Sequence, residues 1–101
     1  MSSDGSPYAR FQRALKTGNL TIIRAAARDL PRVDLGDALC VCMAIRAAEP
    51  DRFERAALRW LARFSAERAR SITDVREAAA ALAAIPYDAE GALVTLQALC
   101  R

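Results

Sequence analysis

The sequence contains no histidine, and this absence narrows the chemistry open to the chain. Histidine is the commonest general base, a common metal ligand and the usual partner of a serine or cysteine nucleophile. The four glycines, Gly5, Gly18, Gly36 and Gly91, form neither a phosphate-binding loop nor a dinucleotide-binding fingerprint. We therefore expect no enzymatic activity, and with it no catalytic residues, no cofactor and no metal.

Cysteine is scarce as well, and an odd count of three excludes a disulfide-stabilised scaffold. Cys40 and Cys42 would lie about 200° apart around a helix, so they cannot pair or chelate one metal together. Because free cysteine is among the most buried residue types, we expect both to serve packing. With Cys100 far away in the sequence, nothing here points to an oxidising compartment, and we expect a cytoplasmic protein.

Long hydrophobic runs are missing too. No run exceeds the eight residues of positions 38–45, against about 20 for a membrane-spanning helix. The first seven residues have neither the basic segment nor the apolar segment of a signal peptide. We expect no association with a membrane.

Lysine is nearly absent, because the sequence has one lysine, Lys16, and 14 arginines. Together with 12 acidic residues this gives a net charge of +3. An arginine-rich and alanine-rich composition of this kind is typical of GC-rich bacterial genomes. The arginine excess therefore permits binding to a polyanion but does not by itself indicate it.

The residues that are present predict an all-α protein. Hydrophobic residues make up 53% of the 101 residues and recur with a helical period in six segments. These lie near residues 8–17, 20–30, 35–48, 50–68, 72–85 and 89–101, and no segment alternates with period two. Their short linkers favour five or six short antiparallel helices in one compact domain over residues 8–101, after a flexible tail over residues 1–7. A helical bundle and a short stack of helical hairpins both fit.

Helix start and stop signals separate these segments. Gly18 suits the left-handed conformation at a helix end, and Pro31 forces the preceding residue out of the helical region. Five residues at predicted helix starts have the side chains of good N-caps: Asn19, Asp34, Asp51, Ser71 and Asp88. Pro50 and Asp51 open the fourth segment, where Asp51 and Glu54 have the spacing of a capping box.

The buried faces follow from the same spacing. In the fourth segment Phe53, Trp60 and Phe64 lie on one stripe and predict core positions. The first segment would bury Tyr8 and Phe11 among others. The fifth would bury a face made of Ile72, Val75, Ala79 and Leu82.

One short sequence repeats. Residues 10–14 read RFQRA and residues 52–56 read RFERA, 42 positions later. In its paired helices with alanine-rich contacts the chain resembles the helical hairpins of TPR or HEAT arrays in architecture, although no motif of those families matches residue by residue.

Two arginine-rich surfaces are candidates for binding. The first is a stripe on the fourth segment, where Arg52, Arg55, Arg59 and Arg63 are spaced by three or four residues. Such a stripe can clamp the acidic groups of a protein partner, and it can also be an ordinary solvated face.

The second candidate is a basic cluster in the first two segments, made of Arg10, Arg13, Lys16, Arg24 and Arg28. If these segments form a hairpin, the cations gather on one side with only Asp29 nearby. A cluster of this kind would suit the phosphates of a nucleic acid.

By elimination, the sequence predicts a non-catalytic helical interaction module, a small cytoplasmic adaptor or regulator that binds a protein partner. The partner can also be a second copy, which would make a homo-oligomer. The alternative is a nucleic-acid-binding regulator that uses the basic cluster. Salt dependence separates the two, because phosphate binding weakens steeply with salt.

Overall fold

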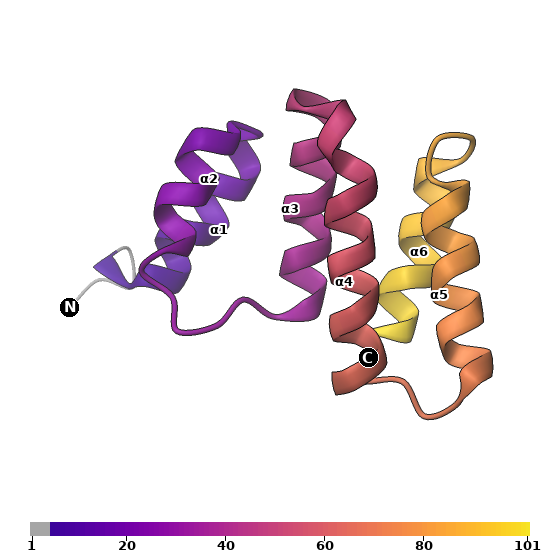
Figure 1. Ribbon diagram of the computed structural model, residues 1–101. Coiled ribbons are helices and arrows are strands. Elements are labelled where there is room, and N and C mark those ends of the chain that lie inside the picture. The colour runs from indigo at the N-terminus through magenta and orange to yellow at the C-terminus, as the bar shows by residue number, and fades with distance from the viewer. Residues whose placement is uncertain (1–4) are drawn as a thin grey trace. The chain divides into compact units, whose positions relative to one another are not determined.

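The computed structural model describes residues 5–101, and every regular element in that range is helical (Figure 1). The α-helices are α1 (Pro7–Thr17), α2 (Leu20–Ala27), α3 (Leu35–Ala48), α4 (Phe53–Glu67), α5 (Ile72–Ala84) and α6 (Ala89–Leu99), with a short 3₁₀ helix, η2 (Pro50–Arg52), before α4. The prediction of an all-α fold with six short helices is confirmed. Of the tail predicted over residues 1–7, the first four lie outside the described range, and Pro7 already belongs to α1.

The chain divides into two compact units, Met1–Ala56 and Ala57–Arg101, whose boundary falls inside α4. The first unit contains α1, α2 and α3, and the second contains α5 and α6. A single domain over residues 8–101 stays a prediction.

Three of the five predicted N-caps are confirmed. The backbone N–H of Ile22 donates to Asn19 Oδ1 at 3.2 Å, and that of Asp74 donates to Ser71 Oγ at 3.2 Å. The N–H of Gly91 donates to Asp88 Oδ1 at 3.0 Å. Each bond satisfies a backbone donor that the first helical turn leaves without a partner.

The bounds of several helices differ from the prediction. Asp51, predicted to open the fourth helix, lies inside η2, and α4 begins only at Phe53. Asp34 has an extended backbone before α3 but makes no side-chain capping bond. Helix α2 stops at Ala27, three residues before the predicted end. The N–H groups of Asp29 and Leu30 donate to the carbonyls three residues back, at 3.2 and 3.1 Å, so the chain tightens into turns before Pro31 is reached.

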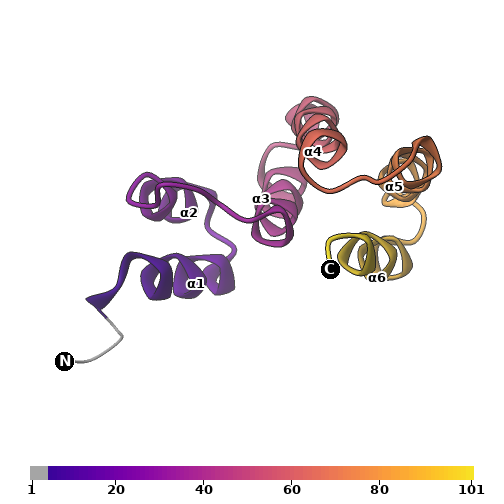
Figure 2. The ribbon, with the colours of Figure 1, turned by 90° about the horizontal axis from the view of Figure 1, so that it is seen from below.

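The core of the first unit forms where α1 packs against α2 and both contact α3 (Figure 2). Phe11 and Ile23 are fully buried there, and Ala14 is 3% exposed. Val41 of α3 is partly buried and packs against this cluster.

In the second unit α5 and α6 lie side by side as a hairpin (Figure 2). Its buried residues include Ala78 and Ile85 of the α5 region and Leu96 of α6. The aromatic residues Trp60 and Phe64 of α4 are buried as well, as their spacing predicts.

Two residues predicted to be buried are exposed instead. Tyr8 is 51% exposed, and its hydroxyl donates to Asp37 Oδ2 at 3.2 Å. Ile72 is 85% exposed, because the buried face of α5 is formed by Ala78, Ala81 and Leu82.

Candidate functional site

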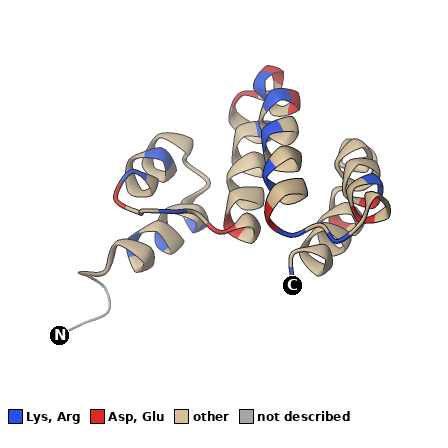
Figure 3. Ribbon diagram, turned by 60° about the horizontal axis from the view of Figure 1, so that its bottom comes forward, with Lys and Arg blue, Asp and Glu red and all other residues tan. Residues whose placement is uncertain are grey.

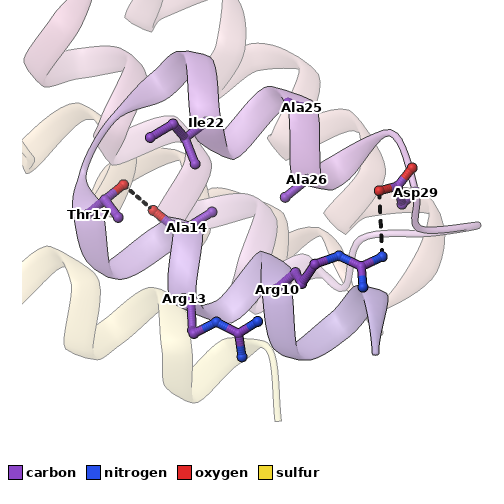
Figure 4. Close-up of a pocket in the computed structure, with 8 residues that line it drawn as sticks. All are labelled: Arg10, Arg13, Ala14, Thr17, Ile22, Ala25, Ala26 and Asp29. Carbon is purple, nitrogen blue, oxygen red and sulfur yellow. Dashed lines mark hydrogen bonds and ion pairs between the residues drawn. The ribbon is translucent and has the colours of Figure 1, made fainter. Parts of the chain in front are cut away.

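A groove of about 430 Å³ runs between α1 and α2 in the first unit (Figure 4). Its apolar wall is made of Ala14 from α1 and of Ile22, Ala25 and Ala26 from α2. Ile22 is 47% exposed. Full burial of a large aliphatic side chain stabilises the folded state by about 1.5–3 kcal/mol, so this exposure leaves stabilisation unused. The short alanine side chains keep the groove open beside it.

Arginine borders this groove on the side of α1. Arg10 and Arg13, one helical turn apart, both line it together with Thr17 and Asp29. Arg10 reaches across to Asp29, with Nη2 and Oδ2 3.8 Å apart and the side chains 44% and 58% exposed (Figure 4). A long ion pair with this exposure is worth little in water, so the Arg10 guanidinium can exchange one carboxylate for another.

The remaining cations of the basic cluster differ in their surroundings. Lys16 and Arg28 are exposed, whereas Arg24 donates two hydrogen bonds to the carboxylate of Glu49, at 3.1 and 3.3 Å. These bonds are the main reason why the pKa of Glu49 is lowered. The prediction that only Asp29 lies near this cluster is therefore wrong, because the linker after α3 brings Glu49 to Arg24.

The arginine stripe of α4 is divided by the boundary between the units. Arg52 lies in η2, and its Nη1 atom is 3.8 Å from Glu49 Oε1. The Nε of Arg63 donates a hydrogen bond to Glu67 Oε2 at 2.9 Å. Arg55 and Arg59 are exposed on α4. Basic residues therefore recur along this part of the chain (Figure 3). Two of the four arginines form ion pairs, Arg52 with Glu49 and Arg63 with Glu67.

Charge is segregated between the two helical hairpins. Between residues 5 and 28 there are five Lys or Arg residues and no Asp or Glu (Figure 3). Between Ile72 and Leu99 there are four acidic residues and a single base, Arg76. This separation of basic and acidic residues can be read from the sequence, but not from the arginine clusters alone.

The acidic hairpin has a groove of its own, about 500 Å³ in volume, between α5 and α6. Its lining includes the polar residues Glu77, Asp88 and Thr95. Its wall consists of small residues, namely Ala80, Ala81, Ala84, Gly91 and Ala92. The sequence prediction did not single out any of these as site residues.

The cysteines lie on different faces of α3, as their spacing predicts. Cys42 is buried and its Sγ donates to the carbonyl of Ala56 at 3.7 Å. Cys40 is exposed, so the prediction that it serves packing is wrong. Partial burial, followed by the charge of Asp37, raises the pKa of the Cys40 thiol.

Residues 5–101 contain no group of three or more Cys, Asp and Glu side chains that could hold a metal ion. No helix in the same range has the length and apolar character needed to cross a membrane.

Comparison with protein families, curated proteins and solved structures gives no significant match for this chain.

Proposed function

We propose that this chain is a non-catalytic interaction module, a small cytoplasmic adaptor or regulator of bacterial origin, and that it binds an acidic protein partner through the groove between α1 and α2. The observation that carries the proposal is the combination of exposed apolar and basic side chains at this groove. An open apolar wall with a half-exposed Ile22 lies beside Arg10 and Arg13, in a hairpin that has no acidic residue before Asp29. Apolar contact enclosed by polar groups is the usual anatomy of a protein interface.

Binding would proceed through two kinds of contact. An apolar side chain of the partner covers Ile22 and Ala25 and removes both from water. Carboxylates on either side of it meet Arg10 and Arg13, and a guanidinium can hold a carboxylate through two parallel hydrogen bonds. The weak pair between Arg10 and Asp29 is exchanged for one with the partner.

Binding to nucleic acid is the second candidate function. The five cations Arg10, Arg13, Lys16, Arg24 and Arg28 lie in a stretch without acids, and this favours an anionic ligand. Two observations favour a protein over a nucleic acid. The groove wall is aliphatic, whereas unpaired bases stack on aromatic side chains, and Arg24 is already engaged by Glu49.

The stripe predicted on α4 provides a second, competing surface for a protein partner. In the second unit Leu58 is 60% exposed and precedes Arg59, so apolar and basic groups are also adjacent there. Arg59 lines neither the α1–α2 groove nor the groove between α5 and α6. A variant at Arg59 is therefore a matched control for one in the α1–α2 groove.

Fluorescence anisotropy with four labelled probes tests the proposal. The probes are a peptide with one leucine between glutamate pairs, the same peptide with glutamine for glutamate, a random-sequence duplex and a single-stranded oligonucleotide. We expect the glutamate peptide to bind and the glutamine peptide to fail. Arg13→Glu and Ile22→Ser should each weaken binding by about tenfold, while Arg59→Glu leaves it unchanged.

Repeating the oligonucleotide titrations at low and at high salt decides between the two candidate functions. If all five cations contact phosphates, binding to the oligonucleotides falls by about 10²–10³ between about 50 and 200 mM salt. Oligonucleotide binding of that kind, without peptide binding, would replace the protein-binding proposal by the nucleic-acid one. Loss of peptide binding in Arg59→Glu but not in Arg13→Glu would move the site to α4.

A further inference from the structure

We infer that the acidic partner is a second copy of this chain, whose α5–α6 hairpin docks on the α1–α2 hairpin of the first. The inference rests on the proposed function, because it names the occupant of the same groove.

Complementary charge is the first argument. The α1–α2 hairpin carries five cations before its first acid, Asp29, while the α5–α6 hairpin carries four acids and one arginine. Opposite charge of this kind steers two surfaces together and disfavours pairing of like with like. Two basic hairpins would repel each other, as would two acidic ones, so the attractive contact joins unlike hairpins.

Exposed apolar side chains supply the second argument. On the acidic hairpin Tyr87 is 90% exposed and Val94 is 67% exposed. Tyr87 lies in the turn before α6, and it is followed by Asp88 and Glu90. An apolar side chain with carboxylates beside it is the chemistry that the groove of Ile22, Arg10 and Arg13 fits.

The shape of the acidic hairpin supports the same docking. Its groove is lined by small side chains together with Glu77 and Asp88, so helix backbones can approach it closely. The basic hairpin exposes Arg13 and Ile22 beside a groove of similar volume. Each hairpin thus offers a hollow and an exposed apolar side chain, with charges of opposite sign.

The contact is heterologous, because two different surfaces of the chain meet. An open assembly therefore leaves one basic hairpin unused at one end and one acidic hairpin unused at the other, unless the copies close into a ring. Association is therefore expected to increase with protein concentration and to weaken with salt.

Sedimentation velocity of the full chain over a wide concentration range, at low salt, tests the inference. We expect the wild-type chain to associate reversibly. Arg13 and Glu77 are exposed and line the two grooves. Arg13→Glu and Glu77→Arg should each raise the dissociation constant of self-association by about tenfold or more. Arg59→Glu and Glu54→Arg make the same changes of charge on exposed positions of α4 and should leave association unchanged.

Mixing the two groove variants gives the sharpest result. In an equimolar mixture, each junction between unlike copies joins either two wild-type surfaces or two substituted surfaces of opposite charge. We expect association to return in the mixture. Failure of the mixture to associate, or equal effects of the α4 controls, would overturn the docking.

The outcomes also separate this inference from the proposed function. A wild-type chain that stays monomeric at every concentration, but binds the glutamate peptide through Arg13, overturns self-association and leaves the groove as a site for another acidic protein. A chain that neither associates nor binds the peptide overturns both.

Discussion

The indole ring of Trp60 stacks on the phenyl ring of Phe64, with ring centroids 5.4 Å apart and planes inclined by 8°. The two residues lie one helical turn apart on α4 and are 2% and 1% exposed. This finding confirms the prediction that the aromatic stripe of α4 belongs to the core.

Trp60→Ala is expected to lower the free energy of unfolding by about 3–5 kcal/mol, because it removes a large buried side chain and leaves a cavity. Leu58→Ala, on the same helix but at a position 60% exposed, should cost less than about 0.5 kcal/mol. Urea unfolding followed by circular dichroism measures both. Equal midpoints for the two variants would mean that Trp60 does not support the core.

The pair of Arg24 and Glu49 makes stability depend on pH. Hydrogen bonds from Arg24 lower the pKa of Glu49 in the folded chain. A carboxyl group of this kind stabilises the folded state above its ordinary pKa of about 4.3, and the effect is lost as the pH falls through the lowered value. Arg24→Gln should therefore reduce the melting temperature at about pH 7, with the difference from wild type closing towards about pH 3.

Arg28→Gln is the matched control for this pH dependence. Arg28 directly follows α2 and is exposed, with no ion pair to an acid among residues 5–101. The melting temperature of Arg28→Gln should differ from that of the wild-type chain by an amount that does not change over the same pH range. A constant difference for Arg24→Gln as well would contradict the assigned role of Glu49.

Gly91 and Asp88 should show coupled effects on stability. A Cβ atom at Gly91 would lie 2.2 Å from Asp88 Oδ2, so Gly91→Ala displaces the side chain that caps α6. In wild type the loss of this cap, about 1 kcal/mol, offsets the gain in helix propensity from alanine. In an Asp88→Ala background the gain of about 1 kcal/mol should appear alone.

A double-mutant cycle by thermal unfolding measures this coupling. Independent, additive effects of the two substitutions would show that the cap survives a side chain at position 91.

The two neighbouring cysteines should differ in reactivity. Iodoacetamide is expected to modify Cys40, which is exposed, and to leave Cys42 untouched in the folded chain. Because the pKa of Cys40 is raised, its alkylation should be slow at neutral pH and rise at a pH above the range of an ordinary thiol. Mass spectrometry of the digested protein locates the label, and the chain unfolded in urea should be labelled at both positions. Rapid labelling of Cys42 in the folded chain would contradict its burial.

The sequence was sufficient to predict most helix positions, because the signals involved are local. The caps at Asn19, Ser71 and Asp88, and the left-handed Gly18 with φ of 69°, depend only on residues within one turn. The early end of α2 escaped prediction, since the residues after Ala27 form turns of the 3₁₀ type that the hydrophobic pattern does not distinguish from helix.

The buried face of α5 shows why packing was harder to predict. The sequence pattern gave weight to Ile72 and Val75, whereas the face that is buried is formed by Ala78, Ala81 and Leu82. At 100° per residue, Ile72 lies about 130° from the centre of that face. Small side chains allow two helices to approach closely, and which alanines do so depends on the neighbouring helix rather than on the sequence of α5.

The candidate site was only partly predictable. The cations Arg10 and Arg13 were identified from their spacing, but the groove beside them depends on how α1 and α2 pack, and on Ile22 remaining exposed. The pairing of Arg24 with Glu49 joins residues 25 positions apart and left no local signal.

Methyl NMR of the isoleucine-labelled chain, titrated with the peptide that carries leucine between glutamate pairs, tests the central claim most directly. Ile22 lines the α1–α2 groove, and Ile72, 85% exposed in the second unit, serves as the internal reference. The account predicts that the methyl signal of Ile22 shifts to saturation while that of Ile72 stays in place. An unchanged Ile22 signal at peptide concentrations that saturate binding would contradict it, because the peptide would then be held somewhere other than the groove.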